Sequence, residues 1–362
     1  MTVGDYESPR IVDHRRHSGW SKLAGSTRRE PDQLTRTEYD ALSASDRANY
    51  DLERSDWHAK LPFVHTSQAA GILAAMNDLL VTNRQSADDV KQAILLDGRA
   101  GQGKSAILKT FLYDRYRQYA GLHAAEPVRG SRRIDVVHVS MRSATNELGC
   151  ATRIRDFFEL PPRGRTEREI TNQVIDAVYE CGVKVFAIDE LHFMGRSRIA
   201  GSRMSNYLKD LLNTTPCTFF FAGNNVRDSE VFTTPGGMDP AAEQFLSLMQ
   251  VHEMRSFLAD DESDEWVKTL MSLEQNLRLL DQQRGDLFWH CADIVWAMTA
   301  GRWRSLAFLI NSACSKAIRT GTERLTPELI GSLKIDALAE PTARKYLPTL
   351  GTGAWTTRPK GA

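Results

Sequence analysis

Short apolar runs alternate along this chain with longer stretches in which apolar residues recur every three or four positions. Runs of four to eight residues rich in branched and aromatic side chains are typical of buried strands. Such runs occupy residues 93–96, 134–141, 183–188 and 218–222, and residues 251–254 are a candidate fifth strand. Strands that are apolar throughout belong to a parallel sheet covered on both faces.

The stretches between these runs have the spacing of helices with one apolar face. Thr35 or Thr37 and Thr66 or Ser67 stand where N-caps are needed, and Gly121 ends one of the helices. The predicted helices cover residues 34–60, 66–80, 105–119, 167–179 and 202–213. This alternation predicts an α/β fold with a parallel five-stranded sheet flanked by helices.

The strand pattern stops after about residue 256, and a wholly helical pattern continues to about residue 336. We therefore expect a small all-α domain after the sheet. The first 35 residues are polar and lack an apolar period, which predicts disorder. The expected parts are a disordered N-terminal arm (1–35), N-terminal helices leading into the core (36–90), the α/β core (91–256), the helical domain (257–336) and a loosely ordered C-terminal tail (337–362).

Composition narrows the class of protein further. Of the 362 residues, 41% are hydrophobic and 25% are charged, as in globular proteins. Lys and Arg (46) balance Asp and Glu (46), which excludes a uniformly basic nucleic-acid coat but leaves room for a local basic patch. No apolar run is long enough to cross a bilayer, and the N-terminus lacks the apolar stretch of a secretory signal. We expect a cytoplasmic protein that does not contact a membrane.

Five cysteines stand at positions 150, 181, 217, 291 and 314. None of them forms a CxxC pair, which favours reduced thiols over a metal or disulfide framework. Cys181, Cys217 and Cys291 border apolar segments, and we expect them to be buried packing residues.

The strongest chemical signal is the segment Gly98-Arg99-Ala100-Gly101-Gln102-Gly103-Lys104-Ser105, which fits G-x-x-x-x-G-K-[ST]. It lies between a predicted strand and a predicted helix, as a phosphate-binding loop requires. Glycines let backbone N–H groups turn toward phosphate oxygens, Lys104 can reach the β- and γ-phosphates, and Ser105 can place its hydroxyl on Mg²⁺. The expected nucleotide contacts are Gly98, Gly101, Gln102, Gly103, Lys104, Ser105 and Ala106.

Two carboxylates, Asp189 and Glu190, end the strand predicted at residues 183–188. Together with a phosphate-binding loop, Asp189 would hold Mg²⁺ from the strand tip. Glu190 would polarise the water that attacks the γ-phosphate. Without that loop, the pair would fit equally well as the charged cap of a helix.

The strand predicted at residues 218–222 is followed by Gly223, Asn224 and Asn225. Asn224 is nearer the strand tip and is the better candidate to orient the attacking water. A carboxamide transfers no proton, so its catalytic role would be positioning. The alternative is an Asn-rich turn with no part in catalysis.

These motifs resemble, in kind and order, those of the AAA+ ATPases: a P-loop, an Asp-Glu strand, a polar sensor strand and a helical lid. The resemblance implies an AAA+ core at residues 91–256, a lid at 257–336, and ATP and Mg²⁺ as cofactors. The sequence shows no N/TKxD motif of the kind that reads guanine, which favours adenine. Gly301-Arg302-Trp303-Arg304 is similar to the Gly-x-x-Arg opening of a sensor-2 helix. Arg304 would then reach the γ-phosphate, and an ordinary arginine at a helix start is the alternative.

Among AAA+ proteins, residues 55–335 look most like the TniB/TnsC group of transposition ATPases. That resemblance implies ATP-dependent assembly on duplex DNA, which marks a target site and recruits or activates a transposase. The implied partners are duplex DNA, further copies of the chain, a DDE-type transposase and a targeting adaptor. The residues that carry the resemblance are Trp57, Thr66, the short P-loop, Ile188-Asp189-Glu190-Leu191-His192, Ala222-Gly223-Asn224 and the Gly-x-x-Arg segment.

One departure from this group concerns the arginine that acts on a neighbouring subunit's ATP. Members tend to carry it just before a Phe ahead of the fifth strand, where this chain has Gln244 before Phe245. Arg203, Arg227 and Arg255 are the alternatives nearby. Because such an arginine raises the rate about 10³–10⁵-fold in related NTPases, its absence predicts slow, switch-like hydrolysis.

Arginines also provide the candidate DNA contacts. In an oligomer they could line a pore and neutralise phosphates without reading bases; solvated helix faces or salt bridges between subunits are the alternative. His192 would be structural, or would link the catalytic residues to DNA, because no second metal ligand lies at a useful spacing. The candidate arginines are Arg142, Arg153, Arg155, Arg163, Arg165, Arg168, Arg196, Arg198 and Arg203.

Two other classes of function compete with transposition. A signalling or defence ATPase usually adds long repeat or effector domains, and a replication initiator or helicase loader usually adds a winged helix after the lid. Residues 337–362 are too few for either addition, so we expect the transposition function.

Overall fold

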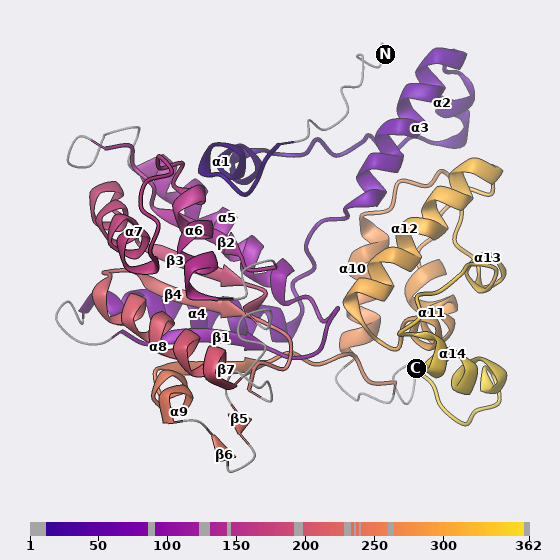
Figure 1. Ribbon diagram of the computed structural model, residues 1–362. Coiled ribbons are helices and arrows are strands. Elements are labelled where there is room, and N and C mark those ends of the chain that lie inside the picture. The colour runs from indigo at the N-terminus through magenta and orange to yellow at the C-terminus, as the bar shows by residue number, and fades with distance from the viewer. Residues whose placement is uncertain are drawn as a thin grey trace. The chain divides into compact units, whose positions relative to one another are not determined.

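The computed structural model describes residues 12–85, 91–122, 131–142, 146–191, 198–227, 233–234, 237–238, 240–259 and 264–357. It divides into two compact units (Figure 1). The core unit comprises Ile11–Thr27 and Gln68–Met254, and the lid unit includes Arg28–Ser67 and Arg255–Ala362.

The core unit is built on a five-stranded sheet with the strand order β2-β3-β4-β1-β7, in which every pairing is parallel. This confirms the sheet predicted from the apolar runs, including the fifth strand. In the register, Leu95 at the centre of β1 lies opposite Phe221 on one side and Val251 on the other. The strands are β1 (Ala93–Asp97), β2 (Val136–Ser140), β3 (Val185–Asp189), β4 (Thr218–Ala222) and β7 (Met249–Glu253).

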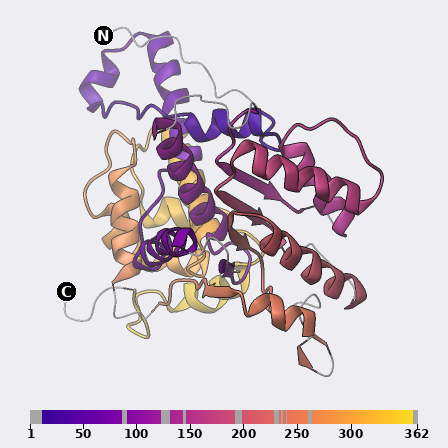
Figure 2. The ribbon, with the colours of Figure 1, turned by 90° about the vertical axis from the view of Figure 1, so that its left-hand side faces the viewer.

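Helices cover both faces of this sheet. Connections between parallel strands are right-handed as a rule, so the strand order puts α5 on one face and α7 and α8 on the other, as Figure 2 shows. The core-unit helices are α1 (His17–Gly25), α4 (Ser67–Gln85, beginning at the last lid-unit residue), α5 (Lys104–Leu122), α6 (Glu147–Phe157), α7 (Glu167–Cys181), α8 (Arg198–Thr214) and α9 (Pro240–Leu246). The short antiparallel strands β5 (Thr233–Thr234) and β6 (Gly237–Met238) were not expected from the sequence.

The three phenylalanines of β4 show how tightly both faces are filled, because successive residues of a strand point to opposite faces. Phe220 packs against Phe111 of α5 with a ring-centroid distance of 4.9 Å. On the other face, Phe219 stacks on Phe186 at 4.9 Å, and Phe221 meets Phe245 of α9 at 5.6 Å. These side chains are almost completely buried and fix the strand tips from which the candidate site is built.

The structure places a helix inside the segment expected to be a disordered arm. In α1, Trp20 is only 1% exposed and packs among aromatic side chains of the core unit. The burial of Trp20 against residues far away in the sequence stabilises α1, although the segment has no periodic pattern of apolar residues. The disorder expected for residues 1–35 is therefore wrong for this helix.

The lid unit is helical, as expected, but it is formed by two separate parts of the chain, one before the core sheet and one after it. Residues 36–90 were expected to lead into the core, yet α2 and α3 belong to the lid unit and α4 to the core unit. The lid-unit elements are α2 (Arg36–Asp40), α3 (Ala44–Ala59), α10 (Glu265–Gln275), the π-helical turn η2 (Asp286–His290), α11 (Ala292–Thr299), α12 (Trp303–Thr320), α13 (Pro327–Gly331), α14 (Glu340–Tyr346) and the 3₁₀ turn η3 (Leu347–Thr349).

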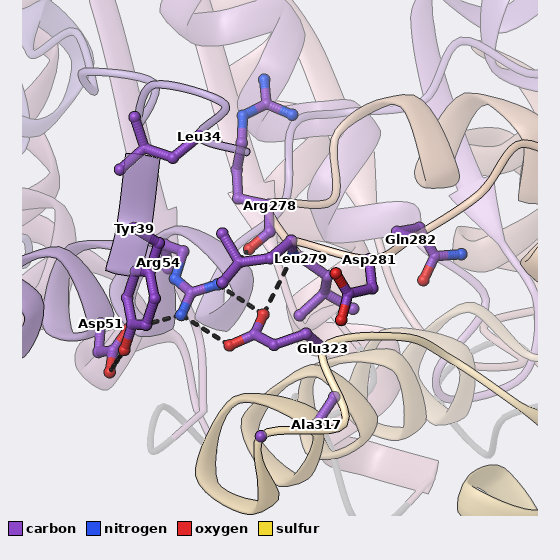
Figure 3. Close-up of polar contacts among 12 residues, drawn as sticks. Leu34, Tyr39, Asp51, Arg54, Arg278, Leu279, Asp281, Gln282, Ala317 and Glu323 are labelled. Carbon is purple, nitrogen blue, oxygen red and sulfur yellow. Dashed lines mark hydrogen bonds and ion pairs between the residues drawn. The ribbon is translucent and has the colours of Figure 1, made fainter. Parts of the chain in front are cut away.

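A buried ion pair joins α3 to the loop after α12 (Figure 3). Arg54 is 0% exposed and donates to both carboxylate oxygens of Glu323, at 2.7 and 3.0 Å. It also bonds Asp51, and its guanidinium lies 4.8 Å from the centroid of the Tyr50 ring. Glu323 in turn accepts the backbone N–H of Leu280 at 3.1 Å. This network ties α3 to the C-terminal helices of the lid unit.

The C-terminal segment, expected to be a loose tail, packs against α11 of the same unit. Trp355 and Tyr346 surround Trp296 with ring-centroid distances of 5.4 and 5.0 Å. Thr357 donates its backbone N–H and its hydroxyl to Asp293 at 2.6 and 2.7 Å. The described part of residues 337–362 therefore belongs to the folded lid unit.

All five cysteines are free thiols. Cys217 and Cys291 are buried as expected, and burial raises the pKa of each thiol to about 12. Cys181 is only half-buried, whereas Cys150 and Cys314 are fully buried. Within the described ranges, no helix has the length and apolar character needed to cross a membrane.

Removing Glu323 tests how much the buried ion pair contributes. Glu323→Ala leaves Arg54 buried beside a single, partly exposed carboxylate, so the lid unit should lose roughly 3 kcal/mol of unfolding free energy. Native-state hydrogen exchange at α3 and α12 measures this loss. The matched control is Glu340→Ala, which removes the exposed partner of Arg344 and should have little effect. Equal losses in the two variants would contradict the assignment.

Candidate nucleotide site

The predicted phosphate-binding loop connects β1 to α5 at the carboxyl edge of the sheet. Gly98, Gly101 and Gly103 all have positive φ angles, of 139°, 83° and 92°, which side-chain-bearing residues rarely adopt. A Cβ atom at Gly98 would lie 2.7 Å from the carbonyl oxygen of Met254, so only glycine fits there. The loop is therefore a turn of the shape that directs successive N–H groups to one side, as an anion site needs.

Lys104 begins α5 and is 6% exposed. Its ammonium donates to the carbonyl oxygens of Gly98 and Arg99, at 2.8 and 2.7 Å. The side chain therefore lies across the loop that precedes it. Ser105 follows and is half-buried. The positive charge and the positive end of α5 thus coincide, which favours phosphate.

A buried carboxylate that the sequence analysis missed connects this loop to the next strand tip. Asp97, the last residue of β1, is 4% exposed. One of its oxygens accepts the N–H of Gly98 at 2.8 Å and that of Val226 at 2.7 Å; the other accepts the N–H of Arg227 at 3.4 Å. The segment after β4 is thereby attached to the P-loop. The available sequence signal was a carboxylate ending an otherwise apolar strand directly before the first glycine.

Asn224 lies in the segment that Asp97 holds. On either side of it, Gly223 donates its N–H to Leu96 of β1 at 3.1 Å and Asn225 donates to Gly98 at 3.2 Å. Both flanking residues are thus bonded to the strand and loop that carry the phosphate motif. The half-buried side chain of Asn224 is held beside the P-loop, where a positioning role for a carboxamide is sterically reasonable.

Asp189 is the last residue of β3 and Glu190 follows it, and β3 lies two strand positions away from β1. Asp189 is 5% exposed, and its carboxylate accepts the N–H of Glu190 at 2.8 Å. Glu190 has a φ of 64°, a left-handed conformation that is costly for a residue with a side chain. Backbone strain of this kind concentrates at functional positions, and here it re-aims the second carboxylate away from the line of the strand.

Arg142, two residues after β2, bonds the carboxylate of Glu190 at 3.3 Å. The sequence analysis grouped this arginine with the candidate DNA contacts, because pairing across neighbouring strand ends cannot be read from spacing. Its side chain is 71% exposed, whereas that of Glu190 is 17% exposed. An exposed cation therefore holds the carboxylate that would polarise water.

Ser105 and Asp189 supply a hydroxyl and a carboxylate, the oxygen donors that Mg²⁺ prefers. In the part of the chain that the structure describes, no group of three or more His, Cys, Asp or Glu side chains could hold a metal. A small oxygen donor set fits Mg²⁺ that arrives with a nucleotide, because this ion keeps phosphate oxygens and water in its shell.

Arg304 belongs to the lid unit, where it is the second residue of α12 and is exposed. Two residues before α12, Gly301 has a φ of 63°, and a Cβ there would lie 2.1 Å from the carbonyl oxygen of Phe257. The N–H of Phe257 donates to Gly301 at 3.0 Å. The glycine of the Gly-x-x-Arg segment is thus required for packing within the lid unit.

The three alternative trans arginines differ in their surroundings. Arg227 lies 3.6 Å from Asp97 of its own chain. Arg203 on α8 and Arg255 are both exposed. Gln244, at the position where an arginine was expected, bonds Lys209 of α8. His192 and Arg196 lie outside the described residues, and the side chain of Arg198 is likewise not described.

The fold and these motifs define a class: the chain has the AAA+ fold, which implies a P-loop ATPase. Similar solved structures include Cdc6p from Pyrobaculum aerophilum, with a TM-score of 0.55, 17% identity and coverage of 76% of this chain and 69% of that one. The ORC1 protein of Aeropyrum pernix in complex with DNA has a TM-score of 0.52 and 16% identity, covering 76% of this chain and 67% of that one. The ORC2 protein of Aeropyrum pernix with ADPNP and ADP has a TM-score of 0.54 and 13% identity, covering 80% and 71%.

The narrower assignment comes from the sequence. The profile of the bacterial TniB proteins matches residues 54–235, about half of the chain, and the chain belongs to this family. No curated protein sequence matches it. The suspected TniB-like resemblance is confirmed at the level of the family.

Lys104→Ala should weaken Mg-ATP binding at least tenfold, because it removes a buried positive charge that lies across the P-loop. Calorimetric titration measures the affinity. Lys109→Ala, which removes an exposed lysine further along α5, is the matched control and should bind ATP as the natural chain does. Equal affinities for both variants would reject the assignment of Lys104.

Arg142→Ala should raise the ATPase rate severalfold and leave ATP affinity unchanged, since it frees the Glu190 carboxylate to meet the attacking water. Steady-state phosphate release and ATP titration separate the two quantities. Glu190→Gln should slow hydrolysis without loss of binding. A fall in ATP affinity on either change would show that the pair has a structural role.

Proposed function

We propose that this chain is an ATP-driven switch that oligomerises on duplex DNA, selects target sites and recruits or activates a transposase, with a targeting adaptor as a further partner in the cytoplasm. The observation that carries the proposal is the arrangement of three motifs at one sheet edge: the P-loop after β1, Asp189 and Glu190 after β3, and Asn224 after β4. Membership of the TniB family supplies the transposition context.

In this proposal the P-loop residues Gly98–Ala106 bind the phosphates of ATP, with Lys104 as the fixed charge. Ser105 and Asp189 would hold Mg²⁺, which supplies neutralisation of the phosphate charge when bound. Glu190 would hold the attacking water as a base, and Asn224 would orient it. Arg304 would contribute from the lid unit.

Two observations support slow hydrolysis. Glu190 is engaged by Arg142 at 3.3 Å, and Gln244 occupies the place where this group tends to carry its trans arginine. Arg227 is held by Asp97 in its own chain, whereas Arg203 on α8 is exposed, which makes Arg203 a better candidate than Arg227 to act on a neighbouring ATP. A slow ATPase suits a switch, because the ATP-bound assembly then persists.

The DNA contact that the structure favours is the segment of residues 158–168, which we name the arginine loop. Arg163, Arg165 and Arg168 are all exposed there. Within the described part of the chain none of the three forms an ion pair. The carboxylate of Glu169, which lies next to Arg168 in the sequence, accepts the backbone N–H groups of Arg165 and Thr166. Three exposed guanidinium groups within six residues suit phosphates of a duplex.

The other arginines proposed from the sequence fit this role less well. The side chain of Arg155 is only 12% exposed and lies 3.0 Å from Asp156. Arg153 is half-buried. Arg142 is engaged with Glu190. The arginine loop therefore replaces Arg153 and Arg155 as the first target for mutation.

Structures of the same fold make nucleotide and DNA binding reasonable expectations. One similar protein was solved in complex with DNA, and another with ADPNP and ADP.

Replacing Arg163, Arg165 and Arg168 together by Ala should weaken duplex binding in the presence of ATP and leave ATP affinity intact. About one phosphate contact is lost per arginine, so the slope of log K against log salt should flatten by about one unit each. Fluorescence anisotropy with a labelled duplex at several salt concentrations measures this. The control removes three exposed charges of the lid unit, Arg284, Arg319 and Lys334. Salt-independent binding by the natural chain, or equal slopes for the two triple variants, would reject the DNA contact.

A further inference from the structure

The N-terminus of α1 is capped by a side chain from a distant part of the core unit. Its N-cap residue, Arg16, makes no side-chain cap hydrogen bond. The N–H of Ser18 donates instead to the carboxylate of Glu159, 141 residues further along, at 2.8 Å. A carboxylate at this position satisfies an orphan donor and complements the positive end of the helix.

Glu159 opens the arginine loop, and its backbone is strained. It lies two residues after the end of α6 and has a φ of 60°, a conformation that favours glycine over glutamate. Its carboxylate also lies 3.4 Å from Arg132. Although partial burial opposes it, hydrogen bonding by Ser18 and the charge of Arg132 hold the pKa of Glu159 below its usual value. Glycine would adopt this backbone conformation without strain, but it has no carboxylate to cap α1 or to pair with Arg132.

A second contact fixes the end of α6 just before the arginine loop. Phe157, the last residue of α6, is 0% exposed. Its ring lies 6.2 Å from that of Trp20 and 5.8 Å from that of His17, both in α1. Trp20 is itself anchored, because its indole N–H donates to Nδ1 of His138 in β2 at 3.1 Å. Figure 1 shows α1 beside α5 and α6.

The middle of the arginine loop is held by α7. Gln173 donates to the carbonyl oxygen of Arg163 at 3.1 Å, and Gly164, with a φ of 82°, makes the turn between the first two arginines. The loop is thus held near its beginning by α1 and at Arg163 by α7. Arg165 follows the second support, and Arg168 lies in the first turn of α7.

We propose that α1 is a positioning element for DNA binding: through Glu159 and Phe157 it holds the arginine loop in the geometry that meets a duplex, without touching DNA or nucleotide itself. This inference rests on the proposed DNA contact. The N-terminal segment would then be a determinant of DNA affinity. Release of α1 from Glu159 and Phe157 would lower that affinity while ATP stays bound.

Glu159→Gly is the sharpest test, because it relieves the strained backbone while it removes the side chain that caps α1. Removing a negative charge should by simple electrostatics strengthen DNA binding slightly, whereas loss of positioning should weaken it. We expect duplex affinity with ATP present to fall about threefold to tenfold and the salt slope to flatten by about one unit. ATP affinity and the thermal midpoint should stay unchanged. Asp114→Ala, which removes another arginine-paired carboxylate of the core unit, is the charge-matched control and should not weaken binding.

Combination with the triple arginine variant separates the two proposals. If α1 acts through the loop, Glu159→Gly should cause no further loss once Arg163, Arg165 and Arg168 are Ala. Additive losses, or unchanged or increased DNA affinity for Glu159→Gly alone, would overturn the inference and leave the DNA contact standing. No effect of the triple variant would instead overturn the DNA contact. Trp20→Phe, which deletes the indole donor to His138 but keeps an aromatic ring, should give a smaller loss of the same kind.

Discussion

The carboxylate of Asp97 is the constraint on which the candidate site depends. It is a buried charge at the end of a strand that is otherwise apolar, and such a charge is tolerated only when hydrogen bonds surround it. The donors are backbone N–H groups of the P-loop and of the segment after β4. One residue thus brings together two motifs that are more than 100 positions apart in the sequence, and the position of Asn224 follows from it.

The lid unit likewise depends on a buried charge, here the positive guanidinium of Arg54. Arg54 has no exposure to water, and the carboxylates that balance it come from its own helix and from the loop after α12. Buried ion pairs contribute little net stability but leave few alternative arrangements, because either partner alone is very unfavourable. On the same helix, α3, the ring of Trp57 packs against the guanidinium groups of Arg28 and Arg278.

The sequence predicted the sheet well because its strands are buried on both faces and therefore read as unbroken apolar runs. The P-loop, Asp189 and Glu190 were predicted because each directly follows such a run. The structure also contains α6, which the sequence analysis passed over because its arginines obscured the spacing of Cys150, Ile154 and Phe157. Trp20 pairs with His138, 118 positions away, and Arg142 pairs with Glu190 across neighbouring strand ends. Contacts of this kind depend on tertiary register and leave no local period in the sequence.

The discontinuous make-up of the lid unit has a consequence for synthesis. Arg54 leaves the ribosome 269 residues before its partner Glu323, a delay of roughly 15–55 s at about 5–20 residues per second. The core unit is complete once residue 254 has emerged, so it can fold while α2 and α3 still lack the surface they pack on. The nascent chain therefore carries a folded core unit while its first helices are still unpacked, and the lid unit can fold only when the last hundred residues have been made.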